Sequence, residues 1–191
     1  MSSHLSAAAW EAMFAPYDPL TYRAVLEFLK PEDIVLDIGA GDLRLSRQMA
    51  QFACKVYAIE INASVLEIGL RTGGLLPANL IPICADARTI EFPSGISTGV
   101  LMMRHSTNFR LYAAKLRASG ARRLITNARW RMGVESVDLL AERTPFRAAD
   151  MGWYACLCGA TGFKEGPAEQ WCMEMDSIHL EVSDCPQCTR V

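Results

Sequence analysis

Three acidic residues and two glycines of this chain have the types and the spacing to hold a nucleotide-shaped ligand. Asp37 ends an apolar run and precedes Gly39 and Gly41, Glu60 ends the next apolar run, and Asp86 follows a third. Glycine allows a tight turn and lets the backbone approach a ligand closely. A carboxylate at the tip of the following strand can accept hydrogen bonds from two ribose hydroxyls. The spacing therefore predicts that these residues meet around one ligand at one edge of a parallel sheet.

A second group, of four cysteines, has the types and the spacing to bind a metal. Cys156 and Cys158 are separated by one residue, and Cys185 and Cys188 by two. Thiolates at such spacings on turns hold zinc in a tetrahedral site, and four of them leave no open position for catalysis. The pattern predicts a structural zinc site, with reduced and unligated thiols as the alternative. Two further residues could replace one of the four ligands, Cys172 or His179.

The residues around the glycines separate two classes of cofactor. A dinucleotide fingerprint would need a third glycine at position 44, where Arg44 stands, so NAD is not favoured. The stretches KVYAIEIN and NLIPICADARTIEFP resemble the class I S-adenosylmethionine-dependent methyltransferases, over residues 33–127 and on toward the C-terminus. The residues of these two stretches are most similar to those of the rRNA adenine dimethylase branch. Leu43 stands in place of the third glycine of the family's common G-x-G-x-G motif.

The resemblance implies a role for each strand-end residue. In the family, the acid before the glycine turn and the turn backbone hold the methionine end of the cofactor. The acid that ends the second strand binds the ribose, and the acid after the third strand binds the adenine amine. Carried across to this chain, the resemblance implies that S-adenosylmethionine is bound by Asp37, Gly39, Gly41, Glu60, Ile61, Asp86 and Ala87.

The tip of the expected fourth strand is where the family positions its methyl acceptor, and here it reads Met103-Arg104-His105-Ser106. Adenine and cytosine N-methyltransferases of the family carry an Asn or Asp there, then two residues, often prolines, and an aromatic residue. This chain departs from that motif. Imidazole titrates near neutral pH, so His105 is the candidate general base, with Arg104 beside it as the second candidate catalytic residue. The alternative for His105 is a helix cap made together with Ser106.

Basic residues gather in the middle of the chain. No Asp or Glu occurs between Ile96 and Gly133, whereas arginines are frequent there. Arg104, Arg129 and Arg131 follow the expected fourth and fifth strands, at the edge where open α/β sheets bind ligands. We expect these three side chains to line a positive mouth for an anionic acceptor, either RNA or a small acid.

Alternating strand and helix patterns surround these residues. Strands are expected over 34–37, 55–60, 80–84, 99–103 and 123–126, and helices over about 43–52, 63–71, 108–118 and 134–142. Such alternation predicts an α/β fold with a Rossmann-like, mostly parallel sheet, helices on both faces and right-handed crossovers. In the methyltransferase family a C-terminal antiparallel strand pair closes the sheet, and its candidates here are 162–165 and 178–182. Such a pair would bring Cys158 beside Cys185.

The expected organisation is a short cap and one larger domain. Residues 32–191 are expected to form a methyltransferase domain that includes the zinc clip from 156 to 188. Residues 1–31 are expected to form an N-terminal helical cap, interrupted by Pro16 and Pro19, over the cofactor side of the sheet. The apolar residues of this cap fall on two faces, with Trp10, Met13 and Phe14 on one and Val25, Leu26 and Leu29 on the other.

Composition narrows the class of protein. The chain has 191 residues, 51% of them hydrophobic, and a formal net charge of −2, which suits a globular domain with a sheet covered on both faces. No apolar run approaches the roughly 18 residues of a membrane span, and the first residues lack a secretory-signal pattern, so the expected location is cytoplasmic. The predicted function is an S-adenosylmethionine-dependent methyltransferase acting on an anionic or nucleic-acid-related acceptor. Two alternatives stay open, a small-metabolite methyltransferase and a non-catalytic S-adenosylmethionine-binding scaffold, and the oligomeric state is not predicted.

Overall fold

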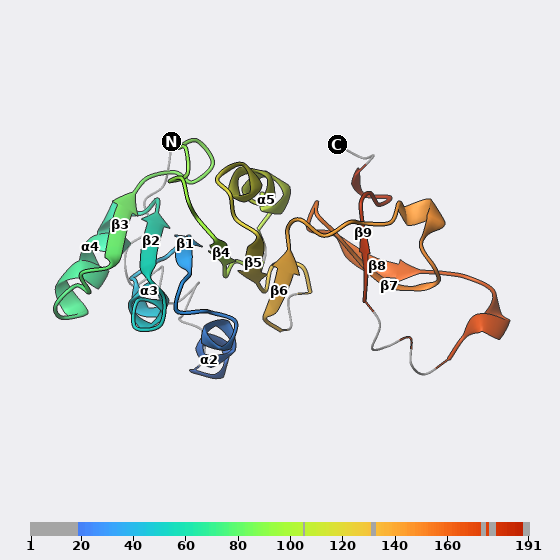
Figure 1. Cartoon of the computed structure of the whole chain (residues 1–191), viewed down its shortest axis with the longest axis horizontal. Helices are drawn as coiled ribbons and strands as arrows, with labels where there is room; N and C mark the ends of the chain where they lie inside the picture. The colour runs from blue at the N-terminus through green and yellow to red at the C-terminus, as the bar shows by residue number, and fades with distance from the viewer. Residues whose placement is uncertain (1–18, 105, 131–132, 173–174, 176–178, 189–191) are drawn as a thin grey trace.

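The main body of the protein is a six-stranded sheet flanked by helices (Figure 1). The computed structural model describes residues 19–104, 106–130, 133–172, 175 and 179–188. The strands, in the order β3-β2-β1-β4-β5-β6, are β1 (Ile34–Ile38), β2 (Lys55–Glu60), β3 (Leu80–Cys84), β4 (Thr98–Leu101), β5 (Arg123–Thr126) and β6 (Glu135–Asp138). Neighbouring strands run parallel except β5 and β6, which are antiparallel. The predicted α/β fold with a mostly parallel, Rossmann-like sheet is confirmed.

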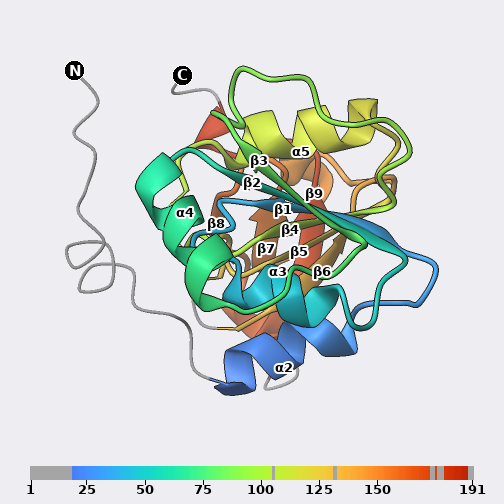
Figure 2. The same cartoon turned by 90° about the vertical axis from the view of Figure 1, so that its left-hand side faces the viewer.

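Helices cover both faces of this sheet, as predicted (Figure 2). Along β1, Val35 and Leu36 are both fully buried but point to opposite faces, because successive strand residues alternate. The face of Val35 packs against α2 (Pro19–Glu27), α3 (Arg44–Met49) and α4 (Ala63–Thr72), and the face of Leu36 packs against α5 (Phe109–Ala118). Two apolar layers therefore hold the strands of the sheet in fixed positions.

The strand order creates one switch point in the sheet. From β1 the chain builds outward through β2 and β3 on one side, then returns to place β4 and β5 on the other. Helices that leave β1 and β4 lie on opposite faces, so the carboxyl ends of these two strands open into a crevice. The glycine turn after β1 and residues 102–104 and 106–108 after β4 lie at this edge.

The predicted helix over 134–142 is wrong, because β6 occupies this segment and pairs with β5. Val137 and Leu139 are both buried, which is the two-residue period of a strand. The antiparallel return of the chain satisfies the outer edge of β5 with backbone hydrogen bonds. It also places Glu135 opposite Thr126, near the carboxyl end of β5.

A second, three-stranded sheet follows, in the order β8-β7-β9. Its strands are β7 (Gly152–Cys156), β8 (Thr161–Lys164) and β9 (His179–Val182), and short 3-10 turns cover Phe146–Ala148 and Ala168–Gln170. The prediction that the segments 162–165 and 178–182 pair with each other and close the main sheet is wrong. They flank β7 instead, β8 antiparallel and β9 parallel to it. The strand β7, which takes the central place between them, was not predicted.

The expected N-terminal cap is described only in part. The helix α2 packs through the fully buried Val25 against the layer that contains Met49 of α3. The remaining cap residues with predicted roles, Trp10, Met13 and Phe14, lie outside the described residues. Within the described ranges, no helix is long and apolar enough to cross a membrane.

Candidate cofactor crevice and metal centre

The turn after β1 has a backbone conformation that requires glycine. Gly39 and Gly41 have φ angles of 77° and 58°, in the left-handed region that side chains disfavour. A Cβ atom at Gly39 would also lie 3.1 Å from Sδ of Met103, which comes from the segment after β4. Leu43 has a φ of 66° and is fully buried, so a leucine adopts here a conformation usually left to glycine. The turn is thus held tightly between β1, α3 and the tip of β4.

Glu60 joins the tip of β2 to this turn. Its Oε2 accepts a 2.9 Å hydrogen bond from the backbone N–H of Gly41, and its Oε1 accepts one of 2.7 Å from Asn62. The side chain of Asn62 in turn caps α4 by accepting from the backbone N–H groups of Ser64 and Val65. Because each carboxylate oxygen has two lone pairs, Glu60 can still accept hydrogen bonds from ligand hydroxyls.

Asp37 lies beneath the turn, on the α3 face of β1. Its carboxyl group is almost fully buried and accepts a hydrogen bond from the hydroxyl of Ser46 in α3. Burial raises the pKa of Asp37 to about 7, and the neighbouring charge of Glu60 acts in the same direction, while the Ser46 hydrogen bond opposes them. The group is therefore poised to change its charge near neutral pH.

A cavity of about 270 Å³ opens beside the turn, between the carboxyl ends of the strands and the first turns of α5. Four of the predicted cofactor-binding residues line it, namely Gly39, Ile61, Asp86 and Ala87. The other three, Asp37, Gly41 and Glu60, form the hydrogen-bonded structure behind the turn. The lining also includes residues that the sequence analysis missed, among them Arg88, Met103, Asn108 and Tyr112. No local signal marked Asn108 or Tyr112, because only the return of α5 over the sheet brings them to the cavity.

Asp86 is engaged by a neighbour within the cavity wall. The guanidinium of Arg88 donates to both carboxylate oxygens, with Nε–Oδ1 and Nη2–Oδ2 distances of 2.9 and 2.6 Å. These hydrogen bonds are the main reason why the pKa of Asp86 is lowered. The Arg88 side chain is about half exposed, and exposed ion pairs contribute little to stability. A ligand amine could therefore share or displace this pairing at small cost.

Arg129 does not take its predicted place in a positive mouth for the acceptor. Its side chain is only 2% exposed, and it donates bidentate hydrogen bonds to both Glu135 and Glu181. Burial opposes its charge, but these two carboxylates together raise its pKa. Arg129 thus links β6 of the main sheet to β9 of the second sheet instead of facing an acceptor.

The other candidate residues on the acceptor side are described only in part. Arg104 is exposed in the turn after β4. His105 and Arg131 lie outside the described residues, so their predicted roles stay predictions. Two further basic residues of this region serve the fold. Lys115 donates to the carbonyls of Ala87 and Ile90, and Arg123 pairs with the buried Asp33.

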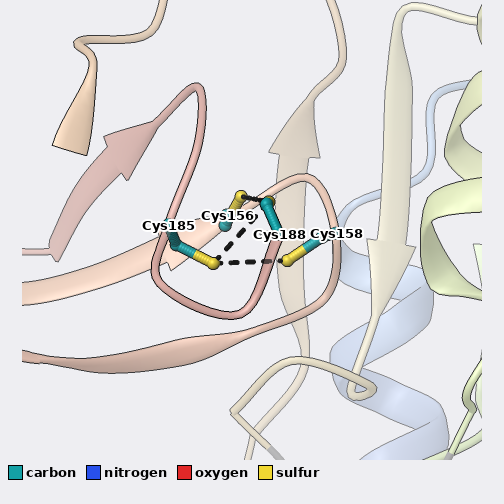
Figure 3. A group of neighbouring side chains, drawn as sticks. All are labelled: Cys156, Cys158, Cys185 and Cys188. Carbon is teal, nitrogen blue, oxygen red and sulfur yellow. Dashed lines mark hydrogen bonds between the residues drawn. The ribbon is translucent and has the colours of Figure 1, made fainter. Parts of the chain in front are cut away.

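The four paired cysteines converge on one point in the second sheet (Figure 3). All four sulfur atoms lie within 4.8 Å of one another, and no disulfide joins them. The Sγ–Sγ distances are 3.6 Å for Cys156 and Cys188, 3.5 Å for Cys158 and Cys185, and 3.7 Å for Cys185 and Cys188. Zn–S bonds of about 2.3 Å in a tetrahedron correspond to sulfur separations of about 3.8 Å. The geometry and the donor set therefore fit a tetrahedral thiolate metal site.

The thiol pKa values show how these sulfur atoms affect one another. Burial raises the pKa of Cys158 to about 11 and also raises that of Cys156. For Cys188, burial acts in the same direction, but hydrogen bonds from the thiols of Cys156 and Cys158 outweigh it and lower the pKa. Without a cation beside them, Cys156 and Cys158 keep their protons near neutral pH.

The candidate alternative ligands lie elsewhere. Cys172 is exposed, and neither it nor His179 belongs to the cluster formed by the described residues. The ring of His179 instead lies 4.6 Å from that of Trp130, measured between ring centroids. Cys158 reaches Cys185 as expected, although by a different route. The end of β7 and the turn after it supply the first cysteine pair, and β9, parallel to β7, leads into the second.

The cysteine cluster is packed against the helix that borders the cavity. Gly159, in the turn after Cys158, has a φ of 95°, and a Cβ atom there would lie 2.8 Å from Cβ of Phe109. Phe109 is the first residue of α5 and follows Asn108, which lines the cavity. The turn that carries Cys158 therefore contacts the first residue of the helix that borders the cavity.

Comparisons with known proteins show similarity of fold, without a match to a protein family. No protein-family model and no curated protein matches the chain. Among solved structures, it is similar to precorrin 8w decarboxylase from Methanobacterium thermoautotrophicum, with 19% identity, a TM-score of 0.50, and coverage of 58% of this chain and 63% of that one. The YcgJ protein from Bacillus subtilis is 14% identical with a TM-score of 0.49, covering 57% of this chain and 50% of that one. The 23S rRNA methyltransferase ErmE is 23% identical with a TM-score of 0.48, covering 58% and 46%. The chain thus spans about half to two thirds of the length of these structures, and the likeness to the first of them shows a shared fold.

Proposed function

We propose that the protein binds S-adenosylmethionine in the crevice and transfers its methyl group to an acceptor. The observation that carries this proposal is the hydrogen bond from Gly41 to Glu60, which fixes a carboxylate and a glycine turn beside the cavity. Gly39 lines the cavity and has no side chain, so a ligand can approach the backbone there. This arrangement of donors and acceptors suits a nucleoside joined to an amino acid.

Each predicted binding residue has a role in this proposal. Glu60 would accept hydrogen bonds from the ribose hydroxyls, and Asp86 would accept one from the adenine amine. Asp37 and the turn from Gly39 to Gly41 would hold the charged methionine end. When bound, the cofactor supplies a methyl group already activated on a sulfonium, so the chain needs mainly to orient the acceptor and exclude water. Ile61 and Ala87 would contact the nucleoside from the cavity wall.

For the acceptor, we propose an anionic molecule, either RNA or a small acid. Exposed arginines without neighbouring acids in the sequence support this class, since residues 96–133 contain no Asp or Glu. Arg104 would position the acceptor, because it follows the tip of β4, and His105 would take up a proton from it. A steep loss of affinity with added salt would indicate a polynucleotide, because each neutralised phosphate releases counterions. A weak salt dependence, with a raised KM in Arg104→Ala, would indicate a small acid.

We further propose that the four-cysteine cluster binds one structural zinc ion. Four thiolates complete a tetrahedral site, so no position remains for a substrate. The ion would hold the turn between β7 and β8 to the segment after β9. The four cysteines do not line the cavity, so this role is structural.

Calorimetry with S-adenosylmethionine and its demethylated product tests cofactor binding. Glu60→Ala should weaken binding by about 1–3 kcal/mol, because the ribose hydroxyls lose a charged acceptor. Glu67→Ala is the matched control, since Glu67 is an exposed residue of α4 paired with Arg71. Absence of binding to the parent protein, or equal affinity in the Glu60 variant, would refute the proposal.

Labelled S-adenosylmethionine with fractionated cell extract tests the transfer itself. Label in RNA, in protein or in small molecules identifies the acceptor class. Binding without transfer to any fraction would favour the non-catalytic scaffold over the enzyme.

A further inference from the structure

Five aromatic rings form a continuous row on the second sheet. We call the side chains of Trp130, His179, Trp153, Phe163 and Trp171 the aromatic row. Their neighbouring ring centroids are 4.6 Å apart for Trp130 and His179, 6.3 Å for Trp130 and Trp153, 5.3 Å for Trp153 and Phe163, and 5.5 Å for Phe163 and Trp171. The rings come from three strands and two connecting segments, so only the tertiary structure brings them together.

Strand register places the centre of the row on one face of the second sheet. Trp153 of β7 lies opposite Phe163 of β8 and opposite His179 of β9. The next residues along two of these strands, Tyr154 and Leu180, belong to the small apolar core that contains the cysteines. Because successive strand residues point to opposite faces, the row occupies the face that this core does not use.

The row is exposed at its two ends and partly buried between them. Trp171 is 59% exposed, His179 is also exposed, and the other three rings are partly buried. Aromatic side chains contribute large apolar area and specific ring geometry to interfaces. Apolar side chains that are grouped and reach solvent mark a binding surface more often than isolated exposed residues do.

The charged residues near the aromatic row indicate which class of partner it can bind. From residue 134 to the C-terminus, Asp and Glu outnumber Lys and Arg by ten to four. Glu165 and Glu169, both exposed, lie in the segment that connects Phe163 to Trp171. The nearest lysine, Lys164, is directed to the other face, where it donates to the carbonyls of Phe146 and Arg147. Two exposed carboxylates repel a polyanion, so this end of the row does not suit RNA.

We propose that the aromatic row binds a basic, arginine-rich polypeptide segment of a partner protein. Guanidinium groups stack on aromatic faces through cation–π contacts, and their fork geometry suits pairing with carboxylates such as those of Glu165 and Glu169. The aromatic rings of Phe163 and Trp171 and the carboxylates of Glu165 and Glu169 all lie within residues 163–171. The proposal does not depend on methyl transfer or on cofactor binding.

Fluorescence anisotropy with the full-length protein and a labelled peptide of alternating arginine and glycine tests the proposal. Trp171→Ala should raise the Kd about three- to tenfold, because one exposed stacking face is lost. The double variant Glu165→Gln, Glu169→Gln should raise it by a similar factor and reduce its salt dependence. Leu75→Ala, which alters a residue that is 97% exposed on the far side of the main sheet, is the matched control and should leave the Kd unchanged.

Two comparisons separate this proposal from its rivals. The proposal would be overturned if the parent does not bind the peptide. It would also be overturned if the parent and the Trp171 variant bind the peptide with equal affinity. Tighter binding of a single-stranded oligonucleotide, lost in Trp171→Ala, would also overturn it and assign the row to nucleobases. If circular dichroism shows that the Trp171→Ala variant is unfolded, the peptide affinity of the double glutamine variant serves as the test. This variant alters two exposed side chains, so it should fold like the parent.

Discussion

The hydroxyl of Ser46 donates a 2.6 Å hydrogen bond to Oδ2 of Asp37, at the buried contact between α3 and β1. This contact fixes the helix that follows the glycine turn to the strand that precedes it. It also leaves a carboxyl group with a pKa of about 7 directly behind the candidate cofactor crevice. The ionisation of Asp37 therefore couples the stability of the turn to pH.

We predict that Asp37 lowers the stability of the protein as the pH rises from about 4 to about 7. In this window the unfolded chain has released a proton, since its Asp37 has the ordinary pKa of 3.8, whereas the folded chain still holds it. The unfolding free energy then falls by at most about 1.4 kcal/mol per pH unit from this group. Asp37→Asn removes the effect. Denaturation at several pH values should therefore show the unfolding free energy of the variant rising relative to that of the parent as the pH increases to about 7.

The control for this prediction is Asp150→Asn, which alters an exposed carboxylate. Its stability should follow that of the parent across the same range. A stability difference between the Asp37 variant and the parent that is constant with pH would contradict the raised pKa.

Metal removal should destabilise the second sheet. We expect elemental analysis of protein purified without added metal to give one zinc per chain, and a chelator to lower the Tm, because the metal binds only the folded form. Cys158→Ser should lose the ion, whereas Cys172→Ser should keep it, since Cys172 is exposed and outside the cluster. A zinc content near zero with four freely titratable thiols would disprove the assignment.

Arg129→Met should destabilise the protein by about 3–5 kcal/mol, because it leaves Glu135 without its buried partner and Glu181 with Arg143 alone. Urea denaturation measures the change. Arg122→Met, at an exposed position of the same segment, should change the unfolding free energy by less than about 0.5 kcal/mol. Similar losses in both variants would mean that the link between the two sheets contributes little.

Gly159→Ala should weaken cofactor binding as well as stability. An added Cβ atom would press on Phe109, and a shift of this residue would move the adjacent Asn108 in the cavity wall. Gly95→Ala is the control, since Gly95 has a similar positive φ of 79° but open space around it. We expect both variants to lose about 1 kcal/mol or more from backbone strain, and calorimetry to show reduced affinity only in the first.

The sequence determined the parts of the protein that depend on neighbouring residues. The strands Lys55–Glu60 and Leu80–Cys84 and the helix Ala63–Thr72 lie where the apolar periods predict them, to within one residue. The glycine turn and the two cysteine pairs could be recognised because their chemistry is set by spacings of one to three residues. These features need no knowledge of which strands become neighbours.

The tertiary structure decided everything that depends on pairing between distant segments. Arg129 looked like a ligand for an anion, but folding places Glu181, 52 positions later, against its guanidinium and neutralises it. The central place of β7 in the second sheet, and with it the aromatic row, follows from strand register that no local pattern contains. The physical reason is that periodicity reports which face of an element is apolar, whereas the partner of a charge or an edge is chosen by the packing of the whole chain.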